Sequence, residues 1–219
     1  MYDEVLLPAL YYAKQDCERE RISEADAEFV AHATREIAED LDQTVRARRP
    51  RTRQRRRAAS CLGASCSCVR PATRSTRVAL AIAGQLIDAT RWQVEILGPS
   101  MLTSEVAQLV EERRPALVCI GSVAPGGVSH TRHLCKRLRA RCPDLNLVVG
   151  RFGLHDESAD EQQQLVEGGA GHIAPTMRDL ARHVAELSLL AETSGSEGRE
   201  AQEMRVPAAR HPLLDARPV

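Results

Sequence analysis

The chain has 219 residues, of which 43% are hydrophobic and only 3% aromatic, and its formal net charge is zero. This length suits one α/β domain with accessory segments. The balanced charge gives no overall field for a nucleic acid or an anionic membrane, and no apolar run approaches the roughly 20 residues of a membrane helix. The number of cysteines, seven, is odd, and the N-terminus does not resemble a signal peptide, so we expect reduced thiols in the cytoplasm.

Residues 1–44 are predicted to form a helical hairpin. Apolar residues recur at helical spacing on both sides of a break at 18–22. Ser23 is the expected N-cap of the second helix, and Asp26 three residues later would complete a capping box. The apolar face of such a hairpin needs a partner elsewhere in the chain.

Residues 45–77 differ sharply in composition from the rest. Eight arginines lie between Arg46 and Arg57, a stretch rich in Ser, Cys, Gly and Ala follows, and further arginines lead up to Arg77. No aromatic residue interleaves with the arginines, so we do not expect nucleic-acid binding. The cysteines of this segment lack the paired C-x₂-C turns of a zinc site.

Two explanations of 45–77 stay open. One is a solvated linker. The other is that GC-rich DNA is read out of frame between compensating frameshifts near Val45 and Arg77, because such reading enriches Arg, Ala, Pro, Ser and Cys without periodicity. GC-rich codons for 70–77, read in a shifted frame, encode an acidic loop. A coding sequence with AT-rich codons in this segment would rule the frameshift out.

Residues 78–190 alternate between helical and strand patterns. The pattern predicts strands at 92–97, 116–121, 145–150 and 171–174, separated by helices and followed by a last helix at 176–190. This order is typical of a doubly wound parallel α/β sheet of flavodoxin-like type, with strand order 2-1-3-4-5. Residues 191–219 lack periodicity and are expected to form a disordered tail.

The first strand of that fold is expected before residue 78, where no strand pattern is visible. Arginines cannot lie unpaired in the centre of a sheet without a large cost in free energy. We therefore predict that 45–77 supplies no regular central strand and leaves a gap between 92–97 and 116–121. Such a chain should fold poorly alone, because the gap exposes two strand edges.

The segment 115–153 indicates where a site lies. It reads as two parallel strands joined by a basic helix, which places the loops after both strands at the carboxyl edge of one sheet, where ligands bind in open α/β folds. Glycines allow close backbone approach, and amides at a helix start can hold an anion. The candidate ligand contacts are Ser122, Gly126, Gly127, Gly150, Arg151, Gly153, Gly168 and Gly169.

No catalytic set accompanies these residues. His130 and His133 lie one helical turn apart, but no third metal ligand is evident, and ordinary helix histidines at the mouth of a cleft are favoured over a metal site. No nucleophile–base pair or carboxylate dyad is visible, and a fold alone implies no chemistry. We therefore expect a binding module that is not an enzyme.

Four segments carry a resemblance to a known family. They are YDEVLLPAL (2–10), ISEADAEFVAHATREIAEDL (22–41), PALVCIGSVAPGGVSHTRHLCKRLRARCPDLNLVVGRFG (115–153) and GGAGHIAPTMRDLARHV (168–184). The first two are similar to the later helices of the cap, and the last two to the sheet domain, of the cobalamin-binding domain superfamily. The sheet most resembles a branch found as the soluble C-terminal extension of membrane permeases of the autoinducer-2 exporter type.

The sequence departs from this family at the cobalt site. The family motif after the first strand is D-x-H-x-x-G, whereas residues 60–80 contain neither Asp nor His, and the cap lacks the family's Trp and Glu-His. The resemblance therefore implies a non-catalytic ligand-binding or regulatory module, in the cytoplasmic part of a permease. Its small-molecule ligand would lie between 122–127 and 150–153. The alternative is a cobalamin (corrinoid) binding domain without the His ligand.

Overall fold

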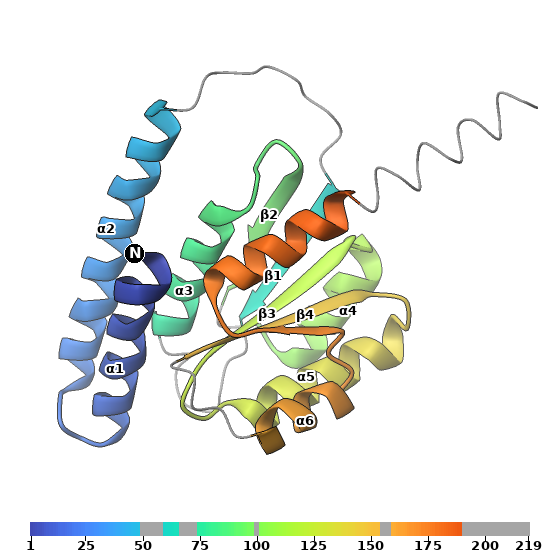
Figure 1. Cartoon of the computed structure of the whole chain (residues 1–219). Helices are drawn as coiled ribbons and strands as arrows, with labels where there is room; N and C mark the ends of the chain where they lie inside the picture. The colour runs from blue at the N-terminus through green and yellow to red at the C-terminus, as the bar shows by residue number, and fades with distance from the viewer. Residues whose placement is uncertain (49–58, 66–73, 99–100, 154–158, 190–219) are drawn as a thin grey trace, which may run out of the picture.

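In the computed structural model, the described residues are 1–48, 59–65, 74–98, 101–153 and 159–189. Within them, five strands form one sheet with the order β2-β1-β3-β4-β5, and every neighbouring pair is parallel. The strands are β1 (Ala59–Ser65), β2 (Trp92–Ile96), β3 (Leu117–Val123), β4 (Asn146–Phe152) and β5 (His172–Ala174). This is the doubly wound, flavodoxin-like parallel fold that the sequence predicts (Figure 1).

The first strand is present, so the prediction that 45–77 supplies no central strand is wrong. β1 pairs with β2 on one edge and with β3 on the other, and it fills the expected gap. The physical reason lies in its sequence, ASCLGAS, which is short and uncharged, while the arginines flank it on both sides. The argument from buried charge does not apply to these seven residues. Because β1 fills the gap, exposed strand edges and poor folding are no longer expected.

Several predicted boundaries also shift. β3 and β4 end at Val123 and Phe152, later than the predicted 121 and 150, because their pairing continues through Ser122 and Arg151. Arg151, which the sequence places in a loop, is thus part of a strand. The remainder of the arginine-rich segment, 49–58 and 66–73, and the predicted tail at 191–219 lie outside the described residues.

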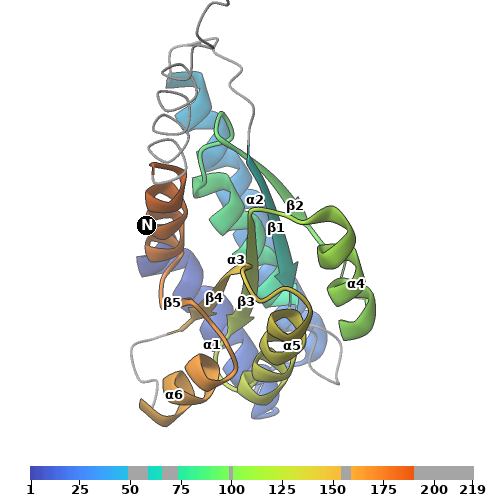
Figure 2. The same ribbon diagram turned by 90° about the vertical axis from the view of Figure 1, so that its right-hand side faces the viewer.

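Helices cover both faces of the sheet. They are η1 (Tyr2–Leu6, a π-helix), α1 (Leu7–Glu18), α2 (Glu24–Arg48), α3 (Arg74–Leu86), α4 (Thr103–Arg113), α5 (Val128–Arg141), α6 (Ala159–Glu167) and a last helix at 177–189. Figure 2 shows α4 and α5 on one side of the strands and the last helix on the other. None of the described helices has both the length and the apolar character needed to span a membrane.

Alternate strand residues build two separate cores. Leu117 and Cys119 belong to the core that contains α3 and the last helix, whereas Val118 and Ile120 belong to the core under α4, α5 and α6. All seven residues of β3 are buried. A strand covered on both faces reads as a continuous apolar run, which is why it is visible in the sequence.

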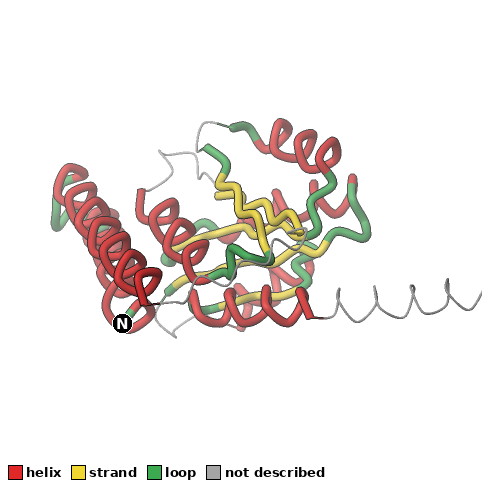
Figure 3. Tube along the Cα trace, turned by 90° about the horizontal axis from the view of Figure 1, so that it is seen from above, coloured by secondary structure: helices red, strands yellow, loops and turns green. Residues whose placement is uncertain are grey.

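The hairpin of α1 and α2 packs into the first of these cores. Leu6, Leu7 and Leu10 are at most 3% exposed and share one cluster with α3. The predicted capping box is confirmed, since the N–H of Asp26 donates to Ser23 Oγ at 3.1 Å and the N–H of Ser23 donates to Asp26 Oδ2 at 3.0 Å. Figure 3 shows the two helices side by side at one end of the sheet. The hairpin therefore finds its apolar partner in the α/β domain itself.

Candidate functional site

The N-terminal helices run along the carboxyl ends of three strands. Just after β5, Asp3 accepts a hydrogen bond from the backbone N–H of Met177 at 2.7 Å. Tyr11 lies close to Gly153, the residue that follows β4, and Lys14 reaches the end of β3. We call the part of the carboxyl edge under η1 and α1 the covered side.

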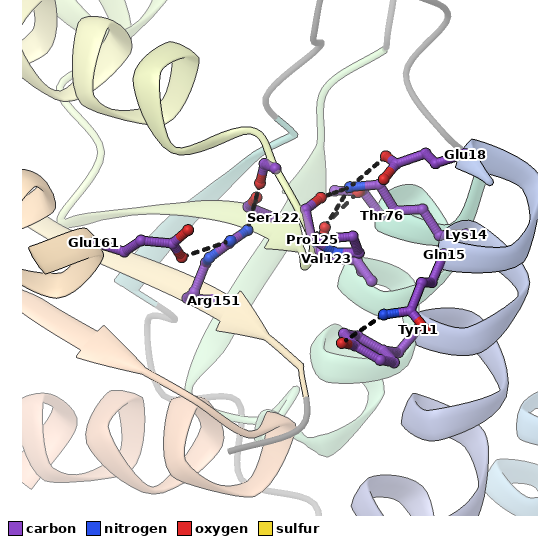
Figure 4. A network of polar contacts seen from close by, with 11 residues as sticks. Tyr11, Lys14, Gln15, Glu18, Thr76, Ser122, Val123, Pro125, Arg151 and Glu161 are labelled. Carbon is purple, nitrogen blue, oxygen red and sulfur yellow. Dashed lines mark hydrogen bonds and ion pairs between the residues drawn. The ribbon is translucent and has the colours of Figure 1, made fainter. Parts of the chain in front are cut away.

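Lys14 fastens α1 to the covered side. Its side chain is only 8% exposed, and Nζ donates to the backbone oxygens of Val123 and Pro125 at 2.5 and 2.6 Å. The carboxylate of Glu18, one helical turn further on, lies 3.7 Å from the same nitrogen (Figure 4). A buried ammonium group is stable only with such acceptors around it, so these contacts fix the hairpin against the sheet.

The other part of the carboxyl edge, which we call the open side, is hollow. A hollow of about 630 Å³ lies between the first turns of α5 and α6. This volume is within the range of small-molecule sites, which is roughly 300–1,000 Å³. The hollow is lined by Gly126, Gly127, Val128, Ser129, His130, His133, Glu161 and Gln164.

Arg151 stands behind this hollow, at the end of β4. Its side chain is 1% exposed, and Nη1 donates to Ser122 Oγ at 3.0 Å and to the backbone oxygen of Gly126 at 2.7 Å. Its other terminal nitrogen, Nη2, forms an ion pair with Glu161 Oε2 at 3.0 Å (Figure 4). The structure thus brings together three residues that the sequence singled out, Ser122, Gly126 and Arg151.

The loop between β3 and α5 is held between two buried cations. Lys14 binds the oxygens of Val123 and Pro125 from the covered side, and Arg151 binds the oxygen of Gly126 from the sheet. One short loop is therefore in contact both with the hairpin, through Lys14, and with Arg151 behind the hollow.

Gly126 and Gly127 make the turn into α5. Their φ angles are 74° and 82°, in the left-handed region that favours glycine. Gly127 is the N-cap of α5 and offers no side chain to the first backbone N–H groups, which have no partner within the helix. Both residues line the hollow, so these amides can receive a negatively charged group.

Two other predicted glycines, one in β4 and one directly after it, have a packing role. A Cβ atom on Gly150 would lie 2.5 Å from the ring of Phe152, and one on Gly153 would lie 2.8 Å from the Cβ of Ala124. Neither glycine is among the residues that line the hollow. Because these two glycines have no side chain, Phe152 and Ala124 can pack closely against them at the end of β4.

Gly168 and Gly169 lie at the opposite edge of the sheet. They precede β5, and the N–H of Gly171 donates to the oxygen of Leu147, near the start of β4. Arg139, near the end of α5, donates to the oxygen of Gly169 at 3.0 Å. Residues before a parallel strand lie at its amino edge, so the structure does not bring these two glycines to the predicted site.

The two histidines lie where the sequence predicts, at the mouth of the hollow. Burial and, to a smaller extent, the neighbouring His133 lower the pKa of His130 below its ordinary value. His130 is therefore neutral near pH 7. The part of the chain that the structure describes contains no group of three or more His, Cys, Asp or Glu side chains placed to hold a metal ion.

Sequence reasoning missed Lys14, Glu161 and Gln164. Lys14 had a usable signal, because it follows Leu10 by four positions and so falls on the apolar face of its helix. A lysine on such a face needs a polar partner in the core. Glu161 and Gln164 belong to a helix that is polar on most sides, and no pattern distinguishes them from its other polar residues.

Comparisons with known proteins match this chain to solved structures at low sequence identity. No protein-family model matches the chain, and no curated protein matches it in sequence. A novel cobalamin-binding protein from Desulfitobacterium hafniense DCB-2 is 14% identical, with a TM-score of 0.44 over 81% of this chain and 77% of that one. The monomethylamine corrinoid protein of Methanosarcina barkeri is 11% identical, with a TM-score of 0.48 over 85% and 96%. A CheY-like protein from Pseudomonas aeruginosa PAO1 is 15% identical, with a TM-score of 0.42 over 59% and 93%.

Proposed function

We propose that this chain is a non-catalytic module that binds a small molecule and serves a regulatory role. The observation that carries the proposal is the hollow on the open side of the carboxyl edge, at the turn Gly126–Gly127 and in front of Arg151. Concave sites with a few convergent polar groups are typical of ligand binding, and the carboxyl edge is their usual place in this fold. The loop that borders the hollow also contacts the hairpin through Lys14, so a ligand that moves this loop would also change its contacts with the hairpin.

The described residues favour this proposal over cobalamin, the alternative ligand. A corrin ring would have to lie across the carboxyl edge, and there Tyr11 of α1 lies close to Gly153 after β4 while Lys14 contacts the end of β3. The sequence also has no histidine between residues 60 and 80, the stretch in which the cobalt ligand of the cobalamin-binding family would be expected. Addition of hydroxocobalamin in the dark should therefore leave its visible spectrum unchanged. A shift in that spectrum would favour the corrinoid alternative.

The experiment for the proposed function is a metabolite screen by thermal shift, run on three proteins. Ser129→Trp fills the hollow from the exposed first turn of α5, and Ala140→Trp adds the same side chain at an exposed position near the other end of that helix. Ligands of the hollow should raise the melting temperature of the wild type and of Ala140→Trp, but not of Ser129→Trp. Mass spectrometry should recover them unchanged. Hits that bind all three proteins equally, or that are converted, would overturn the proposal.

We further propose that the module is the cytoplasmic part of a membrane permease. The support is the resemblance of 115–153 and 168–184 to the soluble extension of such permeases. The genomic reading frame upstream of Met1 tests this placement. Membrane helices encoded in frame would support it, and an in-frame stop codon directly upstream would contradict it.

A further inference from the structure

The ion pair between Arg151 and Glu161 joins two groups in very different surroundings. The side chain of Arg151 is 1% exposed and is oriented by Ser122 and the oxygen of Gly126. The side chain of Glu161 is 35% exposed, stands in the first turn of α6 and lines the hollow. The guanidinium of Arg151 is therefore fixed in position, whereas the carboxylate of Glu161 is partly exposed to water.

We propose that the hollow binds an oxyanion, the carboxylate or phosphate group of a small molecule, and that this group replaces Glu161 as the partner of Arg151. The inference rests on the proposed function and names the ligand class of the same hollow. Glu161 is then an internal stand-in, which pairs with the buried guanidinium while no ligand is bound. On binding, its carboxylate turns outward into water, which it already reaches.

The contacts of Arg151 favour such an exchange. Removing a negative partner from a buried guanidinium is costly, so an anion is a better replacement for Glu161 than a neutral group is. Arginine presents planar, paired donors that match both carboxylate and phosphate groups. Ser122 and Gly126 hold Nη1 from behind, and this leaves Nη2 directed at the position of the Glu161 carboxylate.

The surroundings of that position also suit a second anionic oxygen. Gly126 and Gly127 line the same hollow at the start of α5, where the first N–H groups have no partner within the helix. The amide of Gln164 and the ring of His130 add neutral polar groups to the lining. A neutral ligand would leave Glu161 in place and use none of the charge of Arg151.

The test uses the full chain, with inorganic phosphate and acetate as separate probes against chloride at equal ionic strength. Amide NMR shifts of Gly126 and Gly127 report binding. Glu161→Gln keeps an oxygen acceptor for Arg151 but removes the competing charge, so it should bind one or both probes about three- to tenfold more tightly than the wild type. Glu161→Asp, which is shorter, should shift affinity in the same direction, and Arg151→Lys should lose most binding.

The matched control is Glu167→Gln on the same helix. Glu167 also pairs with an arginine of α5, Arg132, at 3.7 Å, but its side chain is 52% exposed and it does not line the hollow. This variant should bind both probes as the wild type does. Comparison of phosphate with acetate identifies which oxyanion the hollow accepts.

Two outcomes separate this inference from the proposed function. If Glu161→Gln and Glu161→Asp change stability without changing affinity for either probe, the ion pair is purely structural and the inference is wrong. If neither probe binds while a neutral metabolite binds in a manner blocked by Ser129→Trp, the hollow is a ligand site of another class. If the probes bind equally well to Ser129→Trp, they do not enter the hollow, and both the inference and the site of the proposed function fail.

Discussion

The two sides of the carboxyl edge stabilise a buried cation with different partners. Each has a buried cation at the loop between β3 and α5. On the covered side Lys14 binds two backbone oxygens under α1, whereas on the open side Arg151 pairs with the carboxylate of Glu161 beside a hollow. Backbone carbonyls cannot leave their positions without unfolding the loop, but a carboxylate at the surface can.

Because of this difference, the contacts on the covered side serve the stability of the fold, whereas those on the open side are accessible to a ligand. Lys14 has partners that belong to the fold, so its contacts stabilise the folded state and are not available to a ligand. The contact of Arg151 with Glu161 is made by a side chain that water already reaches. A carboxyl edge that is closed on one half and open on the other places any ligand beside α5 and α6, away from the hairpin.

The largest expected effect comes from removal of the cation on the covered side. Lys14→Met keeps the apolar stem but removes the ammonium donor from the oxygens of Val123 and Pro125. Each unsatisfied buried group costs about 1–3 kcal/mol, so we expect the free energy of unfolding to fall by about 2–4 kcal/mol. Urea denaturation measures this change.

Lys136→Met is the matched control, because Lys136 is exposed on α5. It should change the free energy of unfolding by less than about 0.5 kcal/mol. Hydrogen exchange adds a second measurement, since Lys14→Met should also speed exchange at the amides that follow β3. Equal stability of the two variants would show that the covered side is not fastened by Lys14.

A smaller effect is expected at the other end of the covered side. Asp3 caps the last helix by accepting hydrogen bonds from the backbone N–H groups of Met177 and Arg178. Asp3→Ala should lower the free energy of unfolding by about 1 kcal/mol, the usual value of a lost helix cap. Urea denaturation measures the change.

Glu4→Ala serves as the control for Asp3→Ala, because the side chain of Glu4 is 71% exposed and pairs with the N-terminal amine. It should be close to neutral. If Asp3→Ala is equally neutral, η1 is not held against the last helix in solution, and the covered side ends at Tyr11.

Four of the five described strands were predictable. β2, β3, β4 and β5 lie within two residues of their predicted ends, because β3 and β4 contain buried apolar runs and β2 alternates apolar and polar residues. The position of the site at the carboxyl edge follows from the same pattern, and Ser122, Gly126 and Arg151 meet there. Gly168 and Gly169 share the glycine signal, but they precede a strand and so lie at the other edge.

The remaining features depend on contacts that no local pattern encodes. β1 has a sequence of small residues with weak strand preference, and its pairing with β2 and β3 places it in the interior of the sheet. The closure of the covered side depends on Lys14, which is more than a hundred residues away from Val123 along the chain. Glu161 looks like any exposed carboxylate of a polar helix until its distance from Arg151 is known.

The smallest expected effect is a pH dependence that belongs to the open side. Burial and the nearby His133 lower the pKa of His130, so its neutral form favours the folded state. Stability from this group is complete above the unfolded pKa of about 6.5 and is lost as the pH falls through that value toward the lower folded pKa. His130 is partly exposed and is therefore screened by solvent, so the loss should be small. We expect urea midpoints to fall slightly between about pH 7.5 and about pH 5, and His130→Asn to reduce that fall.

A second histidine provides the comparison that sharpens this last prediction. His183, on the last helix, stacks on His172 of β5 with ring centroids 3.8 Å apart. Burial and, secondarily, His172 lower the pKa of His183, which gives the same sign of pH dependence, while Glu186 opposes the shift. His183→Asn should therefore remove a separate and additive part of the fall, because the two histidines lie on different elements. If His183→Asn abolishes the whole pH dependence and His130→Asn changes nothing, the mouth of the hollow is more open to water in solution than the structure shows.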